Sequence, residues 1–393
     1  MVEANSRDFW LATWALCLGS LLVFANLHMT QPLLPLLAQQ FQLTELQASW
    51  SLTIALLTLG LSLLIYGPLS DALGRKPLMV ISLLGAVLST FVLSQVQSYG
   101  GLLLWRGVQG FCLGGLPAIA IAYMGDEFSR KAVALAVGFY ISANSIGGVS
   151  GRLISGFVGE HYSGSTTFAV MGVISLALLI LFIVLLPKSK QFVAKPLQFK
   201  QVISDIIFHL KNPLLLIAFL IAGGNFMMFI HQYSYITFVL DKAPYDLSTH
   251  QLGMLFLTYL TGSVAAALSG HISKYILAAL GMVLGILLLM IGSLLTLVPQ
   301  LEIIIIAFMI NSFGFFLTHS LGSSWVSHHA TRARASASSL YLVFYYLGAS
   351  LGGVVLSPFW NSAGWLGVVL GSLAVYSLTL WGSLWLYRSK SSA

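Results

Sequence analysis

Residues 66–77 read YGPLSDALGRKP, and this stretch decides the fold. Charged residues make up only 7% of the chain, yet Asp71, Arg75 and Lys76 fall together here, among two glycines and two prolines. Asp71 lies near the expected end of a helix, where the macrodipole disfavours an anion, so we expect it to contact a cation or another helix N-terminus. The stretch therefore predicts a charged turn between two membrane helices, with basic residues at the membrane surface.

The composition places most of the chain in lipid. Of its 393 residues, 58% are hydrophobic, and the mean hydropathy is +0.92, whereas roughly 45–50% apolar residues is typical of soluble chains. A span takes about 20 apolar residues, or roughly 30 with its connection, so the length allows about twelve spans and no large soluble domain. Cys17 and Cys112 lie in apolar runs and indicate neither a disulfide framework nor a metal site.

Twelve apolar segments predict an all-α membrane protein with twelve transmembrane helices. The longest polar stretch, KSKQFVAKPLQFKQVISDIIFHLK at 188–211, lies between the sixth and seventh segments. We therefore expect a six-helix bundle at 1–187, a cytoplasmic linker at 188–211 and a second six-helix bundle at 212–393. The expected spans are 9–38, 45–71, 76–96, 99–126, 130–160, 165–187, 212–240, 248–274, 275–298, 302–328, 335–360 and 364–387.

The basic residues predict the orientation in the membrane. With a cytoplasmic N-terminus, Lys242 is the one basic residue in an outer loop, and Arg106 and Arg152 lie inside spans. Every other Lys and Arg then falls in a cytoplasmic segment, which predicts that both termini are cytoplasmic. Contact with anionic lipid accounts for the net charge of +7 without nucleic acid.

An internal repeat supports two halves. FYISANSIGGVSG at 139–151 resembles FYYLGASLGGVVL at 344–356, and YGPLSDALGRKPLMV has an echo in LSGHISKYILAALGMV from residue 268. Two matches at nearly the same offset predict pseudo-symmetric six-helix bundles. Repeated halves are typical of secondary transporters, which bind substrate near the midplane between the repeats.

The opening stretch resembles the signature loop between the second and third helices of the major facilitator superfamily. Ala72 stands at a position that is often basic in that family. The resemblance implies that this loop latches the two halves on the cytoplasmic side, and that Arg75 pairs with Asp126 in one state and not in the other. The gating residues so implied are Gly67, Asp71, Gly74, Arg75, Lys76, Asp126 and Arg130.

Three further motifs support this resemblance. LLLWRGVQG at 102–110 is similar to the fourth-helix motif, and PLLP at 32–35 is similar to the end of the first helix in twelve-helix drug:proton antiporters. SIGGVSG at 145–151 resembles the fifth-helix antiporter motif, with Gly148 at its usual proline position and Arg152 at its final glycine position. The pattern covers nearly the whole chain and resembles the Bcr/CflA-like and arabinose-exporter-like group.

Ionisable groups inside the spans indicate where protons could be handled. A charged side chain at membrane depth costs at least about 2.5–3.5 kcal/mol, and snorkelling to the outer interface is the alternative to a function for Arg106. The resemblance associates Arg106 with proton coupling, and Gln109 lies one turn on. No carboxylate lies deep in an expected span, which leaves His28, His231 and His319, either as titrating groups or as structural hydrogen-bonding residues.

Polar side chains at helical spacing predict a mixed polar and aromatic substrate pocket. Helix–helix hydrogen bonding without a ligand is the alternative for any one of them. With two buried arginines and no buried carboxylate, such a pocket suits neutral, zwitterionic or anionic substrates better than cations. The expected substrate-binding residues are Asn26, Tyr140, Asn144, Arg152, Asn225, Tyr235 and Asn311.

These patterns together predict a proton-coupled secondary active transporter that exports small amphiphilic drugs or sugar-like compounds by alternating access. A proton symporter that takes up a sugar or an organic anion is the alternative, because the fifth-helix motif is degraded. An enzyme, a channel and a sensor are disfavoured, since no catalytic motif, selectivity filter or signalling tail is visible. We expect a monomer in a bacterial inner membrane, acting on a small-molecule substrate and protons, with no cofactor, metal or nucleic acid.

Overall fold

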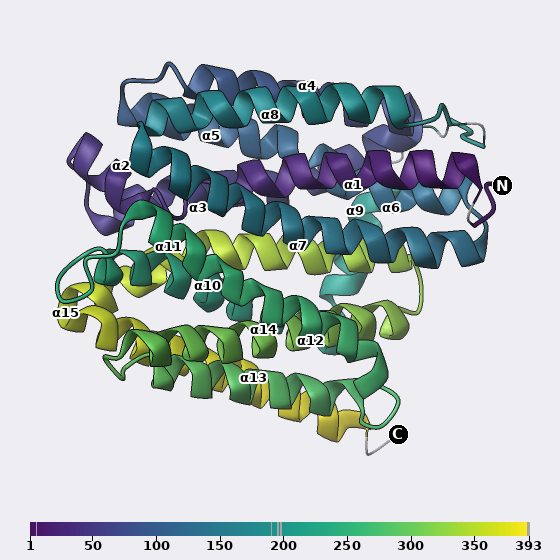
Figure 1. The fold of residues 1–393 in the computed structure, drawn as a ribbon. Coiled ribbons are helices and arrows are strands. Elements are labelled where there is room, and N and C mark those ends of the chain that lie inside the picture. The colour runs from purple at the N-terminus through teal and green to yellow at the C-terminus, as the bar shows by residue number, and fades with distance from the viewer. Residues whose placement is uncertain (5, 190, 195, 197–198, 391–393) are drawn as a thin grey trace. The chain divides into compact units, whose positions relative to one another are not determined.

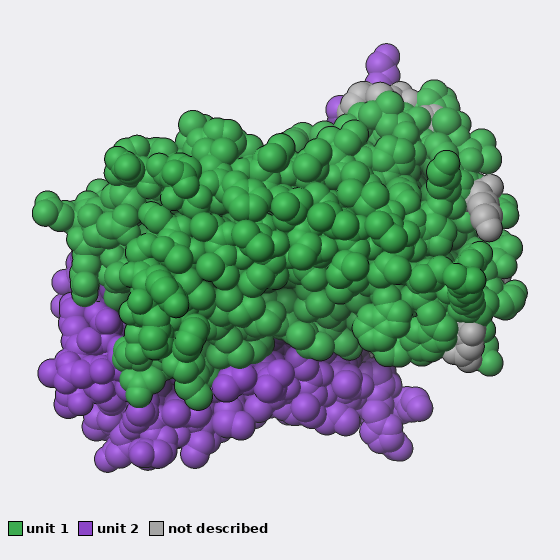
Figure 2. Space-filling view, turned by 45° about the horizontal axis from the view of Figure 1, so that its top comes forward, with its two compact units in different colours: residues 1–199, 248–254 green, residues 200–247, 255–393 purple. Residues whose placement is uncertain are grey.

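The computed structural model describes residues 1–4, 6–189, 191–194, 196 and 199–390. Apart from one isolated bridge between Val2 and Phe128, the regular structure of these residues is helical. The chain forms two compact units (Figure 2). Unit 1 is Met1–Phe199 with Ser248–Met254, and unit 2 is Lys200–Leu247 with Leu255–Ala393.

The helices follow one another along the chain (Figure 1). Those of unit 1 are α1 (Arg7–His28), α2 (Leu34–Phe41), α3 (Glu45–Leu73), α4 (Arg75–Leu93), α5 (Tyr99–Leu113), α6 (Gly115–Glu127), α7 (Arg130–His161), α8 (Gly164–Leu185) and most of α11 (Thr249–Leu255). Those of unit 2 are α9 (Phe199–Leu210), α10 (Pro213–Leu240), η1 (Phe256–Thr258), α12 (Tyr259–Ile272), α13 (Ala278–Leu295), α14 (Leu301–His329) and α15 (Arg334–Lys390). Residues 186–198 separate α8 from α9.

Within the described chain, 11 helices are long and apolar enough to cross a membrane. One of them, α15, has 57 residues and would measure about 86 Å at 1.5 Å per residue, far more than a hydrocarbon core of about 30 Å. Its backbone leaves the helical region at Ala363 (φ −146°) and at Gly364, whose φ of 54° suits a residue without a Cβ. α15 therefore contains two spans, and the twelve predicted spans are confirmed.

The first span differs from the continuous helix expected at 9–38. α1 ends at His28 and α2 begins at Leu34, with a non-helical segment between them. Pro32 and Pro35 explain the break, since proline has no N–H to donate and disfavours a helical conformation in the residue before it. The break leaves carbonyl groups of the last turn of α1 in need of partners.

Apolar side chains hold this break in the interior of unit 1. Met29 and Leu33 are fully buried, and they belong to a cluster with Leu37, Phe168 and Met171. The cluster joins α2 and α8 around the break. Burial of these side chains contributes about 1.5–3 kcal/mol each, so the non-helical segment has a fixed place in the core.

The N-terminal residues lie at the end of unit 1 where α6 stops and α7 starts (Figure 1). Val2 N donates to Glu127 O (2.8 Å), and Ser129 N donates to Val2 O (3.0 Å). From the linker, Gln191 N donates to the Glu127 carboxylate (3.0 Å). The chain start and the start of the linker are thus fixed to the same end of the unit as the YGPLSDALGRKP stretch.

The segment Ser248–Met254 belongs to unit 1 although it follows α10 in the sequence. His250 N donates to the Glu160 carboxylate at the end of α7 (2.8 Å). A Cβ on Gly156 would lie 3.2 Å from the Cα of Gly253, so the two helices meet at glycines. The predicted parts 1–187, 188–211 and 212–393 stay a prediction, and residues 190, 195, 197 and 198 of the linker lie outside the described residues.

Candidate functional site

The YGPLSDALGRKP stretch turns at Gly74, which ends α3 and precedes α4 with a φ of 103°. Few side chains tolerate this conformation, so the turn requires glycine. Arg75 then starts α4 and is buried, with its Nη2 2.6 Å from Asp71 Oδ1 and its Nη1 2.6 Å from Ser70 Oγ. Its Nε donates to Asp126 Oδ2 (3.0 Å) on α6. The ion pair implied by the resemblance is therefore present, while its gating role stays a prediction.

Three other predicted gating residues are Lys76, Gly67 and Arg130. Lys76 Nζ donates to Ile183 O (3.1 Å) and to Leu186 O, and so binds carbonyls at the C-terminus of α8, where a cation is favoured. Among the described residues, no heavy atom would lie within 4 Å of a Cβ on Gly67. The side chain of Arg130 lies outside the described residues.

Arg106 on α5 donates hydrogen bonds to carbonyls of α1 that the break in the first span leaves without helical partners. Its Nη1 donates to Asn26 O (2.9 Å) and its Nη2 to Leu27 O (2.8 Å), both in the last turn of α1. Its Nε donates to Ser51 O of α3 (2.7 Å). The side chain is fully buried, and a guanidinium at a helix C-terminus is stabilised by the macrodipole. Arg106 is thus a buried cap that ties α1, α3 and α5 together.

A network of neutral polar groups surrounds this cap. Gln109 accepts from Arg106 Nη1 through its Oε1 and donates to Thr90 Oγ1 (2.7 Å) on α4. Asn26 Nδ2 donates to Ser175 Oγ on α8 (2.7 Å), and its Oδ1 accepts from Thr90 (3.0 Å). Asn26, Arg106 and Gln109, predicted for substrate or protons, therefore bind one another and the backbone.

Arg152 on α7 contacts the same break from another side. Its Nε and Nη2 donate to Gln31 Oε1 (2.8 and 2.5 Å), and its Nη1 donates to Gly148 O (2.9 Å). A Cβ on Gly148 would lie 3.2 Å from Arg152 Nη1 and 3.7 Å from the ring of His28. The absence of a side chain at Gly148 thus leaves room for a buried guanidinium beside a buried imidazole.

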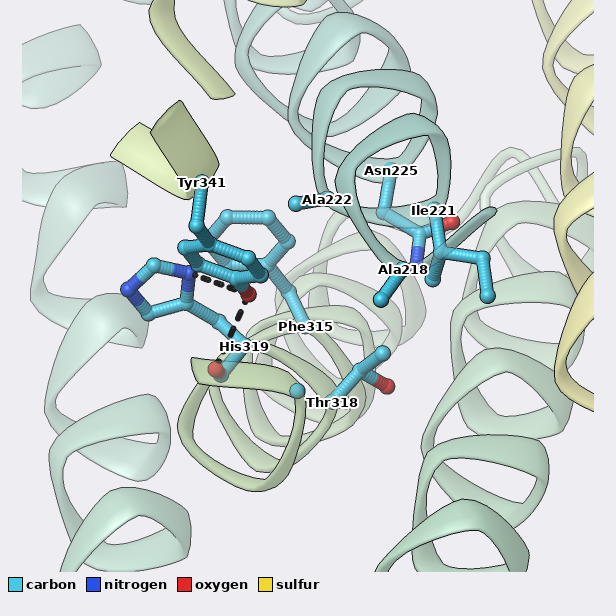
Figure 3. A pocket seen from close by; sticks show the side chains of 9 residues that line it. Ala218, Ile221, Ala222, Asn225, Phe315, Thr318, His319 and Tyr341 are labelled. Carbon is cyan, nitrogen blue, oxygen red and sulfur yellow. Dashed lines mark hydrogen bonds between the residues drawn. The ribbon is translucent and has the colours of Figure 1, made fainter. Parts of the chain in front are cut away.

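A different arrangement occurs in unit 2, where α10, α14 and α15 enclose a hollow (Figure 3). It is a small cavity of about 10 Å³, partly open to its surroundings. None of its lining side chains is Asp, Glu, Lys or Arg. The lining residues are Ala218, Ile221, Ala222, Asn225, Phe315, Thr318, His319, Gly322 and Tyr341.

Two predicted residues, Asn225 and His319, line this hollow from different helices (Figure 3). Asn225 is 2% exposed, and its Oδ1 accepts from Thr379 Oγ1 (2.7 Å). Its Nδ2 points toward the hollow and has no hydrogen-bond partner among the described residues. A buried amide N–H without a partner is uncommon and calls for an explanation.

His319 is oriented by Tyr341 on α15. The Tyr341 hydroxyl donates to His319 O (3.0 Å) and lies 3.2 Å from His319 Nδ1. With the hydroxyl proton on His319 O, the ring hydrogen is assigned to Nδ1, which then donates to the Tyr341 oxygen and leaves Nε2 as the basic nitrogen. Nε2 points away from Asn225 (Figure 3).

Further aromatic rings pack behind Phe315, which lines the hollow. Phe315 stacks on Phe229 with ring centroids 3.9 Å apart, and Phe226 stacks on Tyr345 at 3.8 Å. The ring of Tyr345 also lies 4.6 Å from that of His319. Flat apolar surfaces therefore meet one neutral amide and one imidazole here, an arrangement that suits a planar, neutral group.

The remaining predicted residues make contacts within their own units. In unit 2, His231 Nε2 lies 2.8 Å from Ala349 O, Tyr235 donates to Gly353 O (3.2 Å), and Asn311 donates to Gln232 Oε1 (3.1 Å). In unit 1, Ser20 Oγ donates to Asn144 Oδ1, and Tyr140 is buried. These contacts join helices, and the hollow between Asn225 and His319 does not include these residues.

Sequence reasoning missed three partners that decide these sites: Thr379, Tyr341 and Gln31. Thr379 and Tyr341 lie in different spans of α15, so no local spacing connects them to Asn225 or His319. The four-residue spacing from Phe315 to His319, and from Ala218 to Ala222, is the signal that could have found the faces that line the hollow. Gln31 beside Pro32 offered a weaker signal, a polar residue next to a helix breaker.

Twelve spans, with buried polar clusters inside two compact units, define a multi-pass membrane transporter. The family model described as Major Facilitator Superfamily matches residues 16–353. An inner membrane transport protein of Escherichia coli K12, YnfM, is 37% identical over 371 residues, covering 93% of this chain and 88% of that one. The chain therefore belongs to the Major Facilitator Superfamily.

Two further comparisons agree with this membership. An MFS-type transporter of Bacillus subtilis 168, YybF, which carries the description uncharacterized, is 36% identical over 393 residues, covering 99% of this chain and 96% of that one. The crystal structure of a nucleoside transporter, NupG, superposes with a TM-score of 0.76 at 14% identity, covering 96% of this chain and 99% of that one. The predicted major facilitator fold is thus confirmed.

Proposed function

We propose that the protein exports small, neutral amphiphilic compounds across the inner membrane in exchange for protons, as a monomer, by alternating access. The observation that carries this proposal is the hollow of unit 2, which combines stacked aromatic rings with a neutral amide and an imidazole. Where the structure describes the chain, the buried acidic side chains are Glu127 and Asp205, and both lie beside or within the linker. Cationic substrates would therefore find, among the described residues, no buried carboxylate in the middle of a span, because Glu127 is the last residue of α6.

His319 is the group that we propose exchanges the proton. Its Nε2 is left basic by the Tyr341 contact, whereas His231 uses its Nε2 on Ala349 O. Arg106, which the family resemblance favours, has its guanidinium committed to three backbone carbonyls and Gln109. Release of such a guanidinium would leave buried acceptors unsatisfied, at about 1–3 kcal/mol each.

The proposal also includes a gate formed by Asp71, Arg75 and Asp126. The cytoplasmic side is taken to be the end of unit 1 that carries the N-terminus, Arg75 and Lys76, following the bias of basic residues. When the parts 1–187 and 212–393 rock against each other, the contacts of Arg75 with Asp71 and Asp126 would form in one state and break in the other.

Uptake of an organic anion by symport is the second candidate, and Arg152 is the observation that favours it. This buried guanidinium is held by a neutral amide, Gln31, and by Gly148 O. A substrate carboxylate that displaced Gln31 would form a charge-assisted hydrogen bond, roughly twice as strong as a neutral one.

Proteoliposomes with an acidic interior and an enclosed pH-sensitive dye test the proposal. Neutral aromatic antibiotics, lipophilic cations, pentoses and organic anions are added in turn, with His319→Gln measured beside the parent. Proton release that neutral compounds evoke, and that His319→Gln abolishes, is the expected result. Acidification of a neutral interior by organic anions would instead establish symport, and release by cations alone would overturn the neutral substrate class.

A further inference from the structure

The Asn225 amide is the starting point, because its donor has no partner. Thr379 Oγ1 holds Asn225 Oδ1 at 2.7 Å, which turns Nδ2 toward the hollow (Figure 3). Among the described residues Nδ2 donates to nothing, although the side chain is 2% exposed. An unsatisfied buried donor costs about 1–3 kcal/mol, and a ligand acceptor placed here would remove that cost.

The surroundings restrict what that acceptor can belong to. Elsewhere in the lining, His319 turns Nδ1 toward Tyr341, and Thr318 donates to Gly314 O (2.9 Å), so neither offers a second donor to the interior. Ala218, Ile221 and Ala222 form an apolar wall on the α10 side. A carboxylate would lose its hydration for one neutral hydrogen bond, and an ammonium would meet no acid, so both are disfavoured.

Size restricts the ligand further. Drug-sized ligands occupy pockets of about 300–1,000 Å³, whereas the cavity here is about 10 Å³, about the volume that holds one water molecule. The hollow therefore admits a single polar atom of a ligand, such as a carbonyl oxygen, and the rest of the ligand lies outside it. Phe315 supplies an aromatic face beside that atom, and planar groups pack on such a face.

We propose that the hollow between Asn225 and Tyr341 is a substrate subsite that binds a planar, neutral group through a carbonyl-type oxygen, with Asn225 Nδ2 as the donor. The inference rests on the proposed transport function and names the substrate class of that site. Asn225 is then a specificity-determining residue, since it discriminates between ligands of the same shape by one hydrogen bond. Discrimination of this kind is large when the alternative leaves a buried group unpaired.

Equilibrium binding of three tricyclic probes of the same shape tests the subsite. Fluorenone carries a carbonyl acceptor, carbazole carries an N–H donor, and fluorene carries neither. Binding is measured by dialysis with the protein in lipid nanodiscs, and empty nanodiscs correct for partition into lipid. We expect fluorenone to bind about tenfold more tightly than fluorene, the value of one net hydrogen bond, and carbazole to bind no better than fluorene.

Two variants decide whether Asn225 is responsible. Asn225→Leu keeps the approximate volume and removes the donor, so the preference for fluorenone should vanish while fluorene binding persists. Thr318→Val is the matched control, because it lines the same hollow but its hydroxyl is committed to Gly314 O; it should keep the preference. Size-exclusion profiles identical to the parent show that each variant is folded.

Three results would overturn the subsite. They are a parent without preference for fluorenone, a preference that survives Asn225→Leu, and a parent that binds carbazole most tightly. The last result would mean that the amide is reversed, with the Thr379 hydroxyl donating to Tyr376 O (3.1 Å) instead. Because binding requires no proton gradient, failure of proton exchange in proteoliposomes leaves this test unaffected, and the two proposals fail separately.

Discussion

The polar interior of unit 1 and that of unit 2 are built from similar residues but differ in what is left unpaired. In unit 1, the guanidinium of Arg106 donates to three backbone carbonyls and to Gln109, and these hydrogen bonds join α1, α3 and α5. Around Asn225, one donor faces a space with aromatic walls. A charged residue inside a membrane protein is thus not by itself a functional site. Unused hydrogen-bonding capacity next to free volume is the more informative feature.

The largest effect is expected from substitution of Arg106, which tests whether the polar interior of unit 1 is structural. Arg106→Ala should lower the free energy of unfolding by roughly 3 kcal/mol, since the carbonyls of Asn26, Leu27 and Ser51 lose their donor and each orphaned acceptor costs about 1–3 kcal/mol. Thermal unfolding in detergent, followed by tryptophan fluorescence, measures the change. Arg7→Ala, at an exposed position, is the control and should leave the midpoint unchanged. A stable Arg106→Ala protein would show that the cap is dispensable.

Substitution of Asp126 probes the gate. Asp126→Asn removes the charge that α6 offers to Arg75, while Asp71 and Ser70 still hold that guanidinium. Because Asp126 is partly exposed, stability should change by less than about 1 kcal/mol. The transport rate should fall about tenfold through altered populations of the two states. Glu302→Gln, an exposed acid at the start of α14, serves as control, and equal rates for both variants would contradict a gating role.

Substitution of Ser175 tests whether the hydrogen-bond network of unit 1 affects ligand binding as well as stability. Ser175→Ala removes one acceptor from Asn26 Nδ2, which retains Leu22 O (2.9 Å). The expected loss is about 1 kcal/mol of stability with unchanged ligand preference, because this cluster is structural. If Ser175→Ala altered the discrimination between fluorenone and fluorene, the unit 1 network would have to take part in substrate binding.

The smallest effect is expected at Gly148. A Cβ there would lie 3.2 Å from Arg152 Nη1, so Gly148→Ala requires the guanidinium to move by a few tenths of an ångström. Transport of neutral compounds should change by no more than about threefold, within the roughly 0.5 kcal/mol typical of mild substitutions. A large change confined to organic anions would support Arg152 as their ligand and the symport alternative.

The sequence predicted the fold well because its signals were local. The twelve apolar runs and the turn at Gly74 followed from hydropathy and from one motif, and the family resemblance implied the pairing of Arg75 with Asp126. The break at Pro32 could have been predicted, since prolines interrupt helices, but the expected first span continued across it. Proline chemistry therefore outweighed the apolar pattern at that point.

The candidate site could be predicted only in part. Asn225 and His319 were visible as polar residues in apolar spans, but so were Asn26 and Asn311, which the structure pairs with other helices. Whether a buried amide is satisfied depends on residues far away in the sequence, such as Thr379 for Asn225. Single-span spacing cannot reveal such partners, so it marks candidate residues without separating structural from ligand-binding ones.

The central claim is that the spare capacity around His319 and Asn225 carries the function, whereas the Arg106 cluster holds the fold. The most direct test measures proton release from acidic proteoliposomes on addition of fluorenone, for Arg106→Lys and His319→Gln, each normalised to folded protein. The account predicts that Arg106→Lys retains release and that His319→Gln loses it while still binding fluorenone. Release that persists in His319→Gln and disappears in folded Arg106→Lys would contradict the claim and return proton coupling to the arginine.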